Sequence, residues 1–205
     1  MKFAILAPGG IAHSMAKAVS EIDKIERYAV ASREVKRAQK FAEQWGFEKA
    51  YGSYEEMVQD PQVEFVYVAS PHSHHYEHAK LCLEHGKHVL VEKAFTVNAR
   101  QARELIQLSE EKGLLLAEAI WTRYMPSRRM IDDILSCKAI GNVTSLTANL
   151  GYILPHVDRM QNPELAGGAL LDLGVYPINF ALMAFHGEVK DVHATAIMSP
   201  KGIDW

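Results

Sequence analysis

The chain contains little that would tie it to a membrane, to nucleic acid or to an oxidising compartment. Only two cysteines, Cys82 and Cys137, stand among 205 residues. Both fall in helix-like segments, so each is expected to be a small apolar side chain rather than half of a disulfide. The formal net charge of −3 does not indicate a basic surface that follows a phosphate backbone. The apolar opening, Phe3–Ala7, is too short for a signal peptide and is cut by Pro8. No segment is expected to span a membrane. We therefore expect a cytoplasmic protein with no nucleic-acid partner and no membrane partner.

Strand-like and helix-like patterns alternate through residues 1–122 with short connections. Such alternation predicts an α/β fold with a Rossmann-type, doubly wound, mostly parallel sheet. Asn98 and Gln101 resemble a capping box for the last helix of this part. The expected strands are 2–6, 27–32, 64–70, 87–91 and 114–118, and the expected helices are 11–20, 35–45, 76–85 and 99–112.

The pattern changes after residue 122. Residues 127–135 and 170–185 are expected to be helical, and 143–153 and 189–198 to be β-rich, with a break at Gly167-Gly168. Residues 123–205 are therefore expected to be a second domain. A lone strand pair leaves apolar faces and strand edges uncovered. We expect either a fragment of a longer chain or a sheet covered by another subunit, and we favour the fragment.

The first strand leads into a glycine turn, Ala7-Pro8-Gly9-Gly10-Ile11-Ala12. It is a variant of the dinucleotide-binding pattern Gly-x-Gly-x-x-Gly/Ala, in which a glycine lets the backbone approach a pyrophosphate at a helix N-terminus. We expect Gly9, Gly10 and Ile11 to bind a cofactor there. The alternative is an irregular turn with a purely structural role.

The second expected strand ends at Ser32-Arg33, and Arg37 follows one helical turn later. A carboxylate at this position suits the ribose 2′-hydroxyl of NAD, whereas an arginine suits the 2′-phosphate of NADP. Ser32, Arg33 and Arg37 therefore favour NADP, with NAD as the alternative cofactor. An exposed basic helix start is the structural alternative.

A histidine-rich segment, Ser70-Pro71-His72-Ser73-His74-His75, follows the third expected strand. His74 and His78 have the spacing of a metal-ligand pair on a helix. No cysteine or convincing carboxylate set completes such a site, so we expect no metal. A loop that lines a cofactor crevice is the favoured interpretation.

Glu92 and Lys93 follow directly after the apolar stretch 87–91. Removing a charge from water is unfavourable by several kcal/mol unless the charge is paired or used. The carboxyl ends of strands in an open α/β sheet line the ligand crevice. The position of Lys93 therefore indicates a site residue, and the alternative is a solvated turn.

These motifs together resemble the glucose–fructose oxidoreductase / inositol dehydrogenase / rhizopine catabolism (Gfo/Idh/MocA) family, nearest its dimeric dihydrodiol dehydrogenase and D-xylose dehydrogenase branch. The resemblance covers essentially the whole chain in order. It rests on Ala7–Ala12, Ser70-Pro71-His72 with His75, Glu92-Lys93-Ala94, Glu118-Ala119 with Trp121 and Arg123, and the run from Gly167 to Pro177.

The resemblance implies a nicotinamide-dependent dehydrogenase in which Lys93 lies near the nicotinamide and Tyr176 donates or accepts a proton. It also implies that Asp172 orients the substrate or the tyrosine, and that Trp121 forms a wall of the substrate pocket. It implies a C-terminal α+β domain with a large open, mostly antiparallel sheet that forms a homodimer. The further cofactor contacts implied are Ser70, Pro71, His72, His75, Glu92, Lys93, Trp121 and Arg123. The chain departs from the family pattern at Ala94, where proline is usual, and at Ala7, where glycine is usual.

The chemistry agrees with these implied roles. Free tyrosine titrates near pH 10, too high for an efficient base at neutral pH, and a nearby Lys93 ammonium would favour tyrosinate. We expect an NADP-dependent oxidoreductase that transfers a hydride between the nicotinamide and a C–OH or C=O group of a sugar or vicinal diol. The alternatives are a non-catalytic NAD(P)-binding regulator on the same fold and a redox-neutral NAD-dependent glycosidase. Substrate specificity is expected in residues 152–164.

Overall fold

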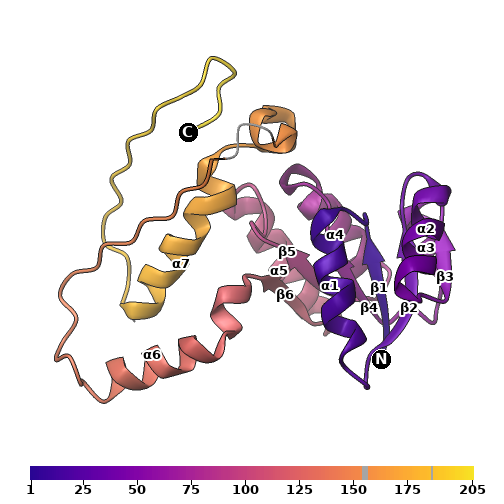
Figure 1. Ribbon diagram of the computed structural model, residues 1–205, viewed down its shortest axis with the longest axis horizontal. Helices are drawn as coiled ribbons and strands as arrows, with labels where there is room; N and C mark the ends of the chain where they lie inside the picture. The colour runs from indigo at the N-terminus through magenta and orange to yellow at the C-terminus, as the bar shows by residue number, and fades with distance from the viewer. Residues whose placement is uncertain (154–156, 186) are drawn as a thin grey trace. The chain divides into compact units, whose positions relative to one another are not determined.

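The computed structural model describes residues 1–153, 157–185 and 187–205. The chain divides into two compact units, Met1–Ala119 and Ile120–Trp205. The first unit is a six-stranded parallel sheet with the order β3-β2-β1-β4-β5-β6 (Figure 1). The strands are β1 (Lys2–Leu6), β2 (Glu26–Ala31), β3 (Lys49–Tyr51), β4 (Phe65–Val68), β5 (His88–Glu92) and β6 (Leu116–Ala119).

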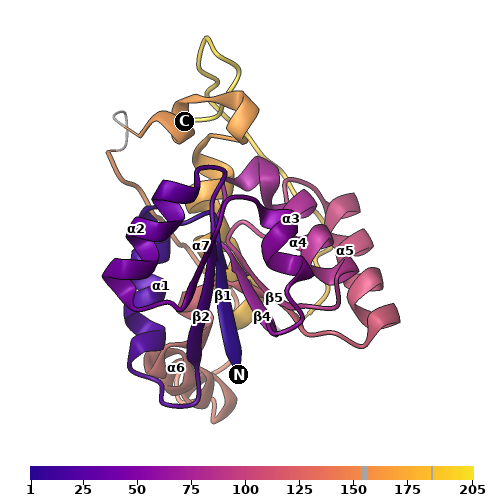
Figure 2. The same ribbon diagram turned by 90° about the vertical axis from the view of Figure 1, so that its right-hand side faces the viewer.

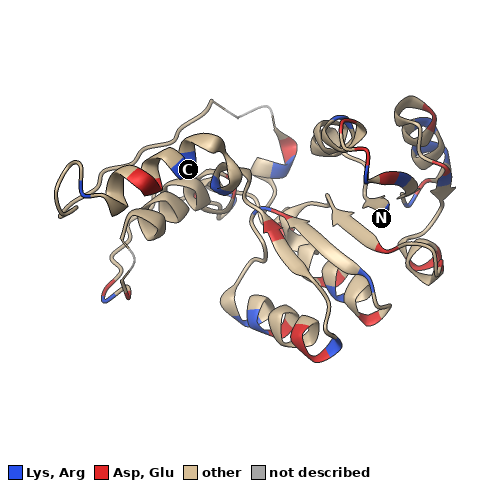
Figure 3. Cartoon of the chain, turned by 90° about the horizontal axis from the view of Figure 1, so that it is seen from below, with Lys and Arg blue, Asp and Glu red and all other residues tan. Residues whose placement is uncertain are grey.

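Helices cover both faces of this sheet, as Figure 2 shows. Helices α1 and α2 pack on one face, where Ile5 and Tyr67 belong to the same buried cluster as Phe41. Helices α4 and α5 cover the other face, around Leu83 and Leu105. Charged residues of both signs are interspersed along the helices, whereas the strands carry few (Figure 3). The helices are α1 (Gly10–Ser20), α2 (Val35–Trp45), α3 (Tyr54–Gln59), α4 (His75–Glu84) and α5 (Ala99–Lys112).

The predicted Rossmann-type parallel sheet is confirmed. The predicted start of α5 is confirmed in detail, because the side chain of Asn98 accepts the N–H of Gln101 at 3.0 Å. The prediction missed β3 and α3, which lie between the second and third predicted strands. The side chain of Ser53 accepts the N–H of Glu56 at 3.1 Å and begins α3.

The order of the strands places the ligand crevice. β1 lies between β2 and β4, and the chain crosses from one side of β1 to the other after β3. In open α/β sheets such a switch point opens a crevice outside the carboxyl ends of the strands. The loops after β1, β2, β4 and β5 all leave from this edge of the sheet.

The carboxylate of Asp60 links several elements of the first unit through hydrogen bonds. Oδ2 of Asp60 accepts hydrogen bonds from the Tyr28 hydroxyl at 2.9 Å, the Lys49 ammonium at 2.8 Å and the Tyr51 hydroxyl at 2.5 Å. Its Oδ1 accepts the N–H of Gln62 at 2.9 Å. This hub joins β2, β3 and the residues after α3.

The described residues of the second unit form helices and short helical turns, separated by long segments without regular structure. The unit contains α6 (Pro126–Ser136) and α7 (Val175–Ala184), short 3₁₀ turns at Trp121–Tyr124, Asp158–Gln161 and Pro163–Leu165, and a π-helical turn at Leu170–Gly174. The strands predicted at 143–153 and 189–198 do not form in the described residues, which have only an isolated antiparallel bridge between Met198 and Asp204. A strand needs a hydrogen-bonded neighbour, so β propensity alone does not create one.

Two predicted features of this unit lie partly outside the described residues. The predicted loop with Pro155 falls on 154–156, and so does part of the predicted specificity segment 152–164. The described remainder of that segment contains the 3₁₀ turns at Asp158–Gln161 and Pro163–Leu165.

Backbone packing explains the glycine pair before the π-helical turn. A Cβ atom on Gly167 would lie 2.5 Å from the carbonyl oxygen of Arg159 and 2.7 Å from that of Met160. Gly168 has a φ of 117°, a conformation that residues with a side chain rarely adopt. The predicted break at Gly167-Gly168 is therefore a close crossing of two backbone segments.

One helical stretch, Pro163–Ala184, is long and apolar enough to cross a membrane by length and composition, at 22 residues. This finding differs from the expectation that no segment could do so. Length and composition are weak evidence for a span by themselves, because the core helix of a globular domain passes the same test.

Candidate active site

The turn between β1 and α1 begins with an alanine in a left-handed conformation. Ala7 has a φ of 62°, a region that glycine adopts readily and that a Cβ disfavours. Its N–H donates to the carbonyl of Ala31 at 3.0 Å, and its carbonyl accepts the N–H of Gly9 at 2.8 Å. The backbone geometry at this position explains why the Gly-x-Gly pattern begins with glycine, and Ala7 adopts that geometry nonetheless.

The start of α1 is open around its glycines. A Cβ atom on Gly9 would meet only backbone oxygens, at 3.9 and 4.0 Å, and one on Gly10 would meet nothing within 4 Å. No side chain in the described part of the chain caps this helix, and first-turn N–H groups have no acceptor in their own helix. Gly9 and Gly10 therefore leave space, and the N–H groups of Gly10 and Ile11 at the helix start are donors that fit a pyrophosphate group.

The loop after β2 and the first turn of α2 carry the predicted NADP residues. Arg37 donates from Nη2 to the carbonyl oxygen of Pro8 at 3.0 Å and so joins α2 to the glycine turn. Ser32 is buried, and its hydroxyl accepts the N–H of Glu34 at 3.3 Å. Arg33 is exposed. Arg37 thus lies beside the turn that would hold phosphates, and Arg33 is the exposed residue that follows Ser32.

A cluster of polar side chains lies after β4. The hydroxyl of Ser70 and Nδ1 of His78 are 2.9 Å apart, and the rings of His74 and His78 stack with centroids 5.6 Å apart. Burial, together with the nearby His74 and His75, lowers the pKa of His78 to about 4, so the ring is neutral at pH 7. No group of three or more His, Cys, Asp or Glu in residues 1–153, 157–185 and 187–205 could hold a metal ion.

Tyr54, the first residue of α3, was missed by the sequence analysis. Its ring meets the ring of His78 edge-on, with centroids 4.7 Å apart. Burial raises the pKa of Tyr54, while the charges of Arg33 and Arg37 act in the opposite direction. Tyr54 therefore packs against His78 and lies within electrostatic range of Arg33 and Arg37. The capping pattern at Ser53 was the signal that could have revealed this helix and its first residue.

His75 is fully buried and connects two loops of the crevice. Its Nδ1 lies 2.7 Å from the carbonyl oxygen of Ala94, and its Nε2 lies 2.8 Å from that of Ser70. Burial lowers the pKa of His75 to about 4. The neighbouring His72 is also buried, follows Pro71, and meets the His75 ring edge-on at 5.6 Å. The ring of His75 thus lies between two backbone carbonyl groups, and its predicted contact with a cofactor stays a prediction.

Glu92 ends β5 with its carboxylate held at both oxygens. Oε1 accepts the hydroxyl proton of Tyr67, and Oε2 accepts the backbone N–H of Lys93 at 3.2 Å. Burial raises the pKa of Glu92, and the bonds from Tyr67 and Lys93 oppose this rise. The peptide bond between Lys93 and Ala94 is cis. The sequence analysis missed Tyr67, because an aromatic residue in a buried strand is typical of core packing.

In the second unit, Trp121 and Tyr176 are joined by a hydrogen bond. The indole Nε1 donates to the Tyr176 hydroxyl oxygen at 3.0 Å, and the two rings meet edge-on with centroids 6.1 Å apart. Arg123 lies on the same 3₁₀ turn as Trp121, and its side chain is exposed. The structure therefore brings together Trp121 and Tyr176, two of the four predicted site residues of the second unit.

Asp172 lies on the π-helical turn, four residues before Tyr176, and is buried. Its two carboxylate oxygens accept hydrogen bonds from the Arg159 guanidinium at 2.8 and 3.3 Å. The sequence analysis did not identify Arg159, because nothing in the local pattern marks a partner thirteen residues away. The ion pair fixes the carboxylate just before α7.

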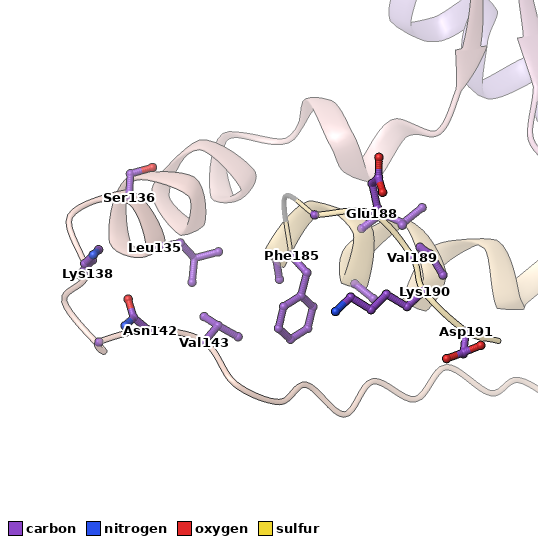
Figure 4. Close-up of a pocket in the computed structure, with 15 residues that line it drawn as sticks. Leu135, Ser136, Lys138, Asn142, Val143, Phe185, Glu188, Val189, Lys190 and Asp191 are labelled. Carbon is purple, nitrogen blue, oxygen red and sulfur yellow. The ribbon is translucent and has the colours of Figure 1, made fainter. Parts of the chain in front are cut away.

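Two hollows among the described residues of the second unit differ in character. Tyr176 borders a pocket of about 310 Å³ together with Met125 and Phe180. A larger hollow of about 770 Å³ lies between the end of α6 and the end of α7 (Figure 4). Leu135 and Phe185 lie at this larger hollow, away from the predicted site residues.

Comparison with known proteins gives family matches to both parts of the chain. A model described as "Oxidoreductase family, NAD-binding Rossmann fold" matches residues 1–119. A model described as "GFO/IDH/MocA C-terminal domain" matches residues 129–204.

Individual relatives agree with these matches. The chain is 43% identical over 208 residues to the D-xylose 1-dehydrogenase (NADP(+)) of Hypocrea jecorina, covering 91% of this chain and 53% of that protein. It is 37% identical over 206 residues to the trans-1,2-dihydrobenzene-1,2-diol dehydrogenase of Xenopus tropicalis, covering 99% and 62%. A 3-ketoreductase from Actinomadura kijaniata, solved in complex with NADP, matches with a TM-score of 0.81 at 33% identity, covering 89% and 57%.

The chain thus spans between 53% and 62% of the length of these two curated relatives. One family model covers more than half of the chain, and both domains of the family are matched in order. The chain belongs to the Gfo/Idh/MocA oxidoreductase family, whose NAD-binding Rossmann fold it forms in residues 1–119.

Proposed function

We propose that this chain is the cofactor-binding domain and part of the substrate domain of an NADP-dependent oxidoreductase that acts on CH–OH groups. The observation that carries the proposal is at the carboxyl edge of the parallel sheet. The open N-terminus of α1 and the Glu92-Lys93 turn both leave the sheet at this edge. An anion-binding helix end and a charged turn along one crevice suit a dinucleotide, whose phosphates and nicotinamide need separate partners.

Four side chains would assist the reaction. When bound, the nicotinamide supplies the redox chemistry by accepting or donating a hydride. The Tyr176 hydroxyl would accept or donate the proton of the substrate hydroxyl. Trp121 donates to the oxygen of that hydroxyl at 3.0 Å, which orients the phenol. The Lys93 ammonium would hold the reacting oxygen, and Asp172 would orient the substrate or the tyrosine from its place beside Arg159.

The remaining predicted contacts are kept as parts of the cofactor site. Ser70, Pro71, His72 and His75 would form the loop after β4 along the crevice, and the buried His75 would act by holding this loop to the turn after β5. Trp121 and Arg123 would lie near the nicotinamide. All of these assignments can be tested by substitution.

NADP is the proposed cofactor, with NAD as the weaker ligand. Support comes from Arg33 and Arg37 at the loop after β2, where a 2′-phosphate would pair with guanidinium groups. The D-xylose dehydrogenase relative is named for NADP, and the matched 3-ketoreductase was solved with NADP. The substrate would be a sugar or a vicinal diol, as the names of the two curated relatives suggest.

We also propose that residues 123–205 belong to a larger domain with an open, mostly antiparallel sheet, beyond a boundary at residue 122. Helix α7 exposes Ile178 and Leu182 one turn apart, on one helix face that such a sheet would cover. Burial of this surface against the sheet would account for the apolar character of Pro163–Ala184 without a membrane. A homodimer through the same sheet and a cytoplasmic location complete the proposal.

The proposal is tested by titrating the chain with NADPH and NADH, following cofactor fluorescence and thermal shift. Tight NADPH binding with weaker NADH binding is expected, and activity is then sought on a panel of aldoses and diols. Lys93→Ala and Tyr176→Phe should bind cofactor and lose activity by orders of magnitude. Failure to bind either cofactor would refute the proposal.

A further inference from the structure

Tyr67 carries a hydroxyl group into the apolar interior beneath the Lys93 turn. It is fully buried on β4, in a cluster that includes Ile5 and Leu90. A buried tyrosine hydroxyl requires a hydrogen-bond partner, and this one donates to Oε1 of Glu92. A phenylalanine would fill the same apolar space, so packing alone does not account for the hydroxyl.

The register of the sheet explains how the two groups meet. Tyr67 pairs with Leu90 on the neighbouring strand β5. Side chains two residues apart on a strand share a face, so Glu92 lies on the same face as Leu90, one pleat further toward the carboxyl edge. The hydroxyl and the carboxylate therefore meet diagonally across β4 and β5, where β5 ends.

The same carboxylate holds the backbone of the turn. With Oε1 bound to Tyr67, Oε2 of Glu92 accepts the N–H of Lys93 at 3.2 Å. A glutamate side chain has several rotatable bonds, and a bond at one oxygen gives the other a defined direction. Two residues further on, a carboxylate oxygen of Glu118 on β6 accepts the N–H of Phe95 at 2.9 Å. The segment around Lys93 is thus held through its N–H groups.

The charges in this region keep Tyr67 a donor. Burial raises the pKa of Tyr67 strongly, and the negative charge of Glu92 adds to this rise, so the phenol stays protonated. Burial also raises the pKa of Glu92, with opposition from Tyr67 and Lys93 and a further rise from Glu118. Tyr67 cannot serve as a proton acceptor here, and its contribution is to direct the carboxylate.

We infer that Tyr67 is a positioning residue that acts through Glu92 to fix the backbone of Lys93, and so directs the Lys93 ammonium toward the nicotinamide end of a bound dinucleotide. This inference rests on the proposed function, since that function assigns the nicotinamide to this turn. The open start of α1 and Arg33 would bind the adenosine phosphates. The Tyr67 contact should therefore matter for the nicotinamide and not for the adenosine end.

The test separates the two ends of the cofactor. NADPH and 2′,5′-ADP, which has the adenosine and 2′-phosphate but no nicotinamide, are titrated by calorimetry into the wild-type chain, Tyr67→Phe and Glu92→Gln. We expect NADPH affinity to fall about tenfold in both variants, which equals about 1.4 kcal/mol, with the affinity for 2′,5′-ADP unchanged. A merely structural role would weaken both ligands equally.

Tyr28→Phe is the matched control. Tyr28 is also fully buried in the sheet and also donates to a carboxylate, that of Asp60 at 2.9 Å. Its removal should leave the ratio of NADPH affinity to 2′,5′-ADP affinity as in the wild type. A fall in this ratio as large as that for Tyr67→Phe would overturn the inference.

Amide hydrogen exchange tests the contact without any cofactor. The Lys93 amide should exchange about tenfold faster in Tyr67→Phe and at the wild-type rate in Tyr28→Phe. Unchanged exchange at Lys93 overturns the inference. A wild-type chain that binds neither ligand overturns the proposed function and the nicotinamide assignment with it. Wild-type binding with an unaltered affinity ratio in both variants overturns the positioning role alone.

Discussion

Replacement of Asp60 by asparagine should destabilise the first unit substantially. One carboxylate accepts hydrogen bonds from Tyr28, Lys49 and Tyr51 at Oδ2, and a backbone N–H at Oδ1. An asparagine cannot accept at both positions, because one of them becomes an NH₂ group. Hydrogen bonds to charged groups contribute roughly 1.5–3 kcal/mol each. Since one group serves all four donors, we expect a total loss of about 3 kcal/mol of unfolding free energy rather than the sum.

The pH dependence gives a second measure of the same network. Burial alone would raise the pKa of Asp60, but hydrogen bonds from Lys49 and Tyr51 outweigh it and hold the pKa well below its usual value. A lowered folded-state pKa means that the stabilisation is fully present above the unfolded-state pKa, near 3.9, and is lost as the pH falls toward the folded-state value. The difference between wild type and Asp60→Asn should be constant from pH 8 to pH 5 and shrink below about pH 4.

The assay is urea denaturation followed by circular dichroism at a series of pH values. Asp23→Asn is the control, since Asp23 is exposed and the substitution makes the same change in charge. This control should alter stability by no more than about 0.5 kcal/mol. An Asp60→Asn loss below about 1 kcal/mol at pH 7, or a loss that already shrinks between pH 8 and pH 6, would refute the reasoning.

Three further substitutions test separate parts of the chain. Gly167→Ala should lower the midpoint of thermal unfolding of the second unit by several degrees, because its Cβ would lie 2.5 Å from the Arg159 carbonyl oxygen; an unchanged midpoint would contradict this packing. Asn98→Ala should lower the free energy of unfolding, measured by urea denaturation, by about 1 kcal/mol through loss of the α5 cap. Asn98→Ser should retain most of the stabilisation that the cap provides. Arg33→Ala should weaken NADPH binding at least tenfold while NADH binding stays the same, as measured by fluorescence titration; equal loss for both would speak against a 2′-phosphate contact.

Local patterns in the first unit were sufficient to predict its fold. The alternation of apolar strands and amphipathic helices, with caps such as Asn98, fixes element type over short distances in sequence. The three residues of β3 and six of α3 are too short for periodicity to identify. The Ser53-x-x-Glu56 cap was the available signal, and the side chain of Ser53 does begin the helix.

The prediction of two β-rich segments in the second unit was wrong for the described residues. Segments 143–153 and 189–198 contain β-branched residues, but β propensity measures how well a side chain fits beside neighbouring strands. Those neighbours are a property of the tertiary structure. Sequence composition does not reveal neighbouring strands. A segment with β propensity but no neighbouring strand remains without regular structure.

Within the candidate site, the sequence marked residues that belong to an informative local pattern and did not mark residues that act through a distant partner. Gly9 and Gly10 were identified from a turn pattern that has a geometric cause. Tyr67 and Arg159 were not, because each acts through a partner, Glu92 or Asp172, that is distant in sequence and close in space. Contacts of this kind depend on strand register and turn geometry, which a single sequence does not reveal.

The buried ring of His75 has a consequence for how two loops of the crevice depend on one another. A neutral imidazole carries one N–H, and carbonyl oxygens of Ala94 and Ser70 lie within 2.8 Å of its two nitrogens. Because burial lowers its pKa to about 4, the ring has a single proton to share between them at neutral pH. The tautomer therefore decides which loop is hydrogen-bonded at a given moment, and ¹⁵N chemical shifts of this one side chain would report that choice directly.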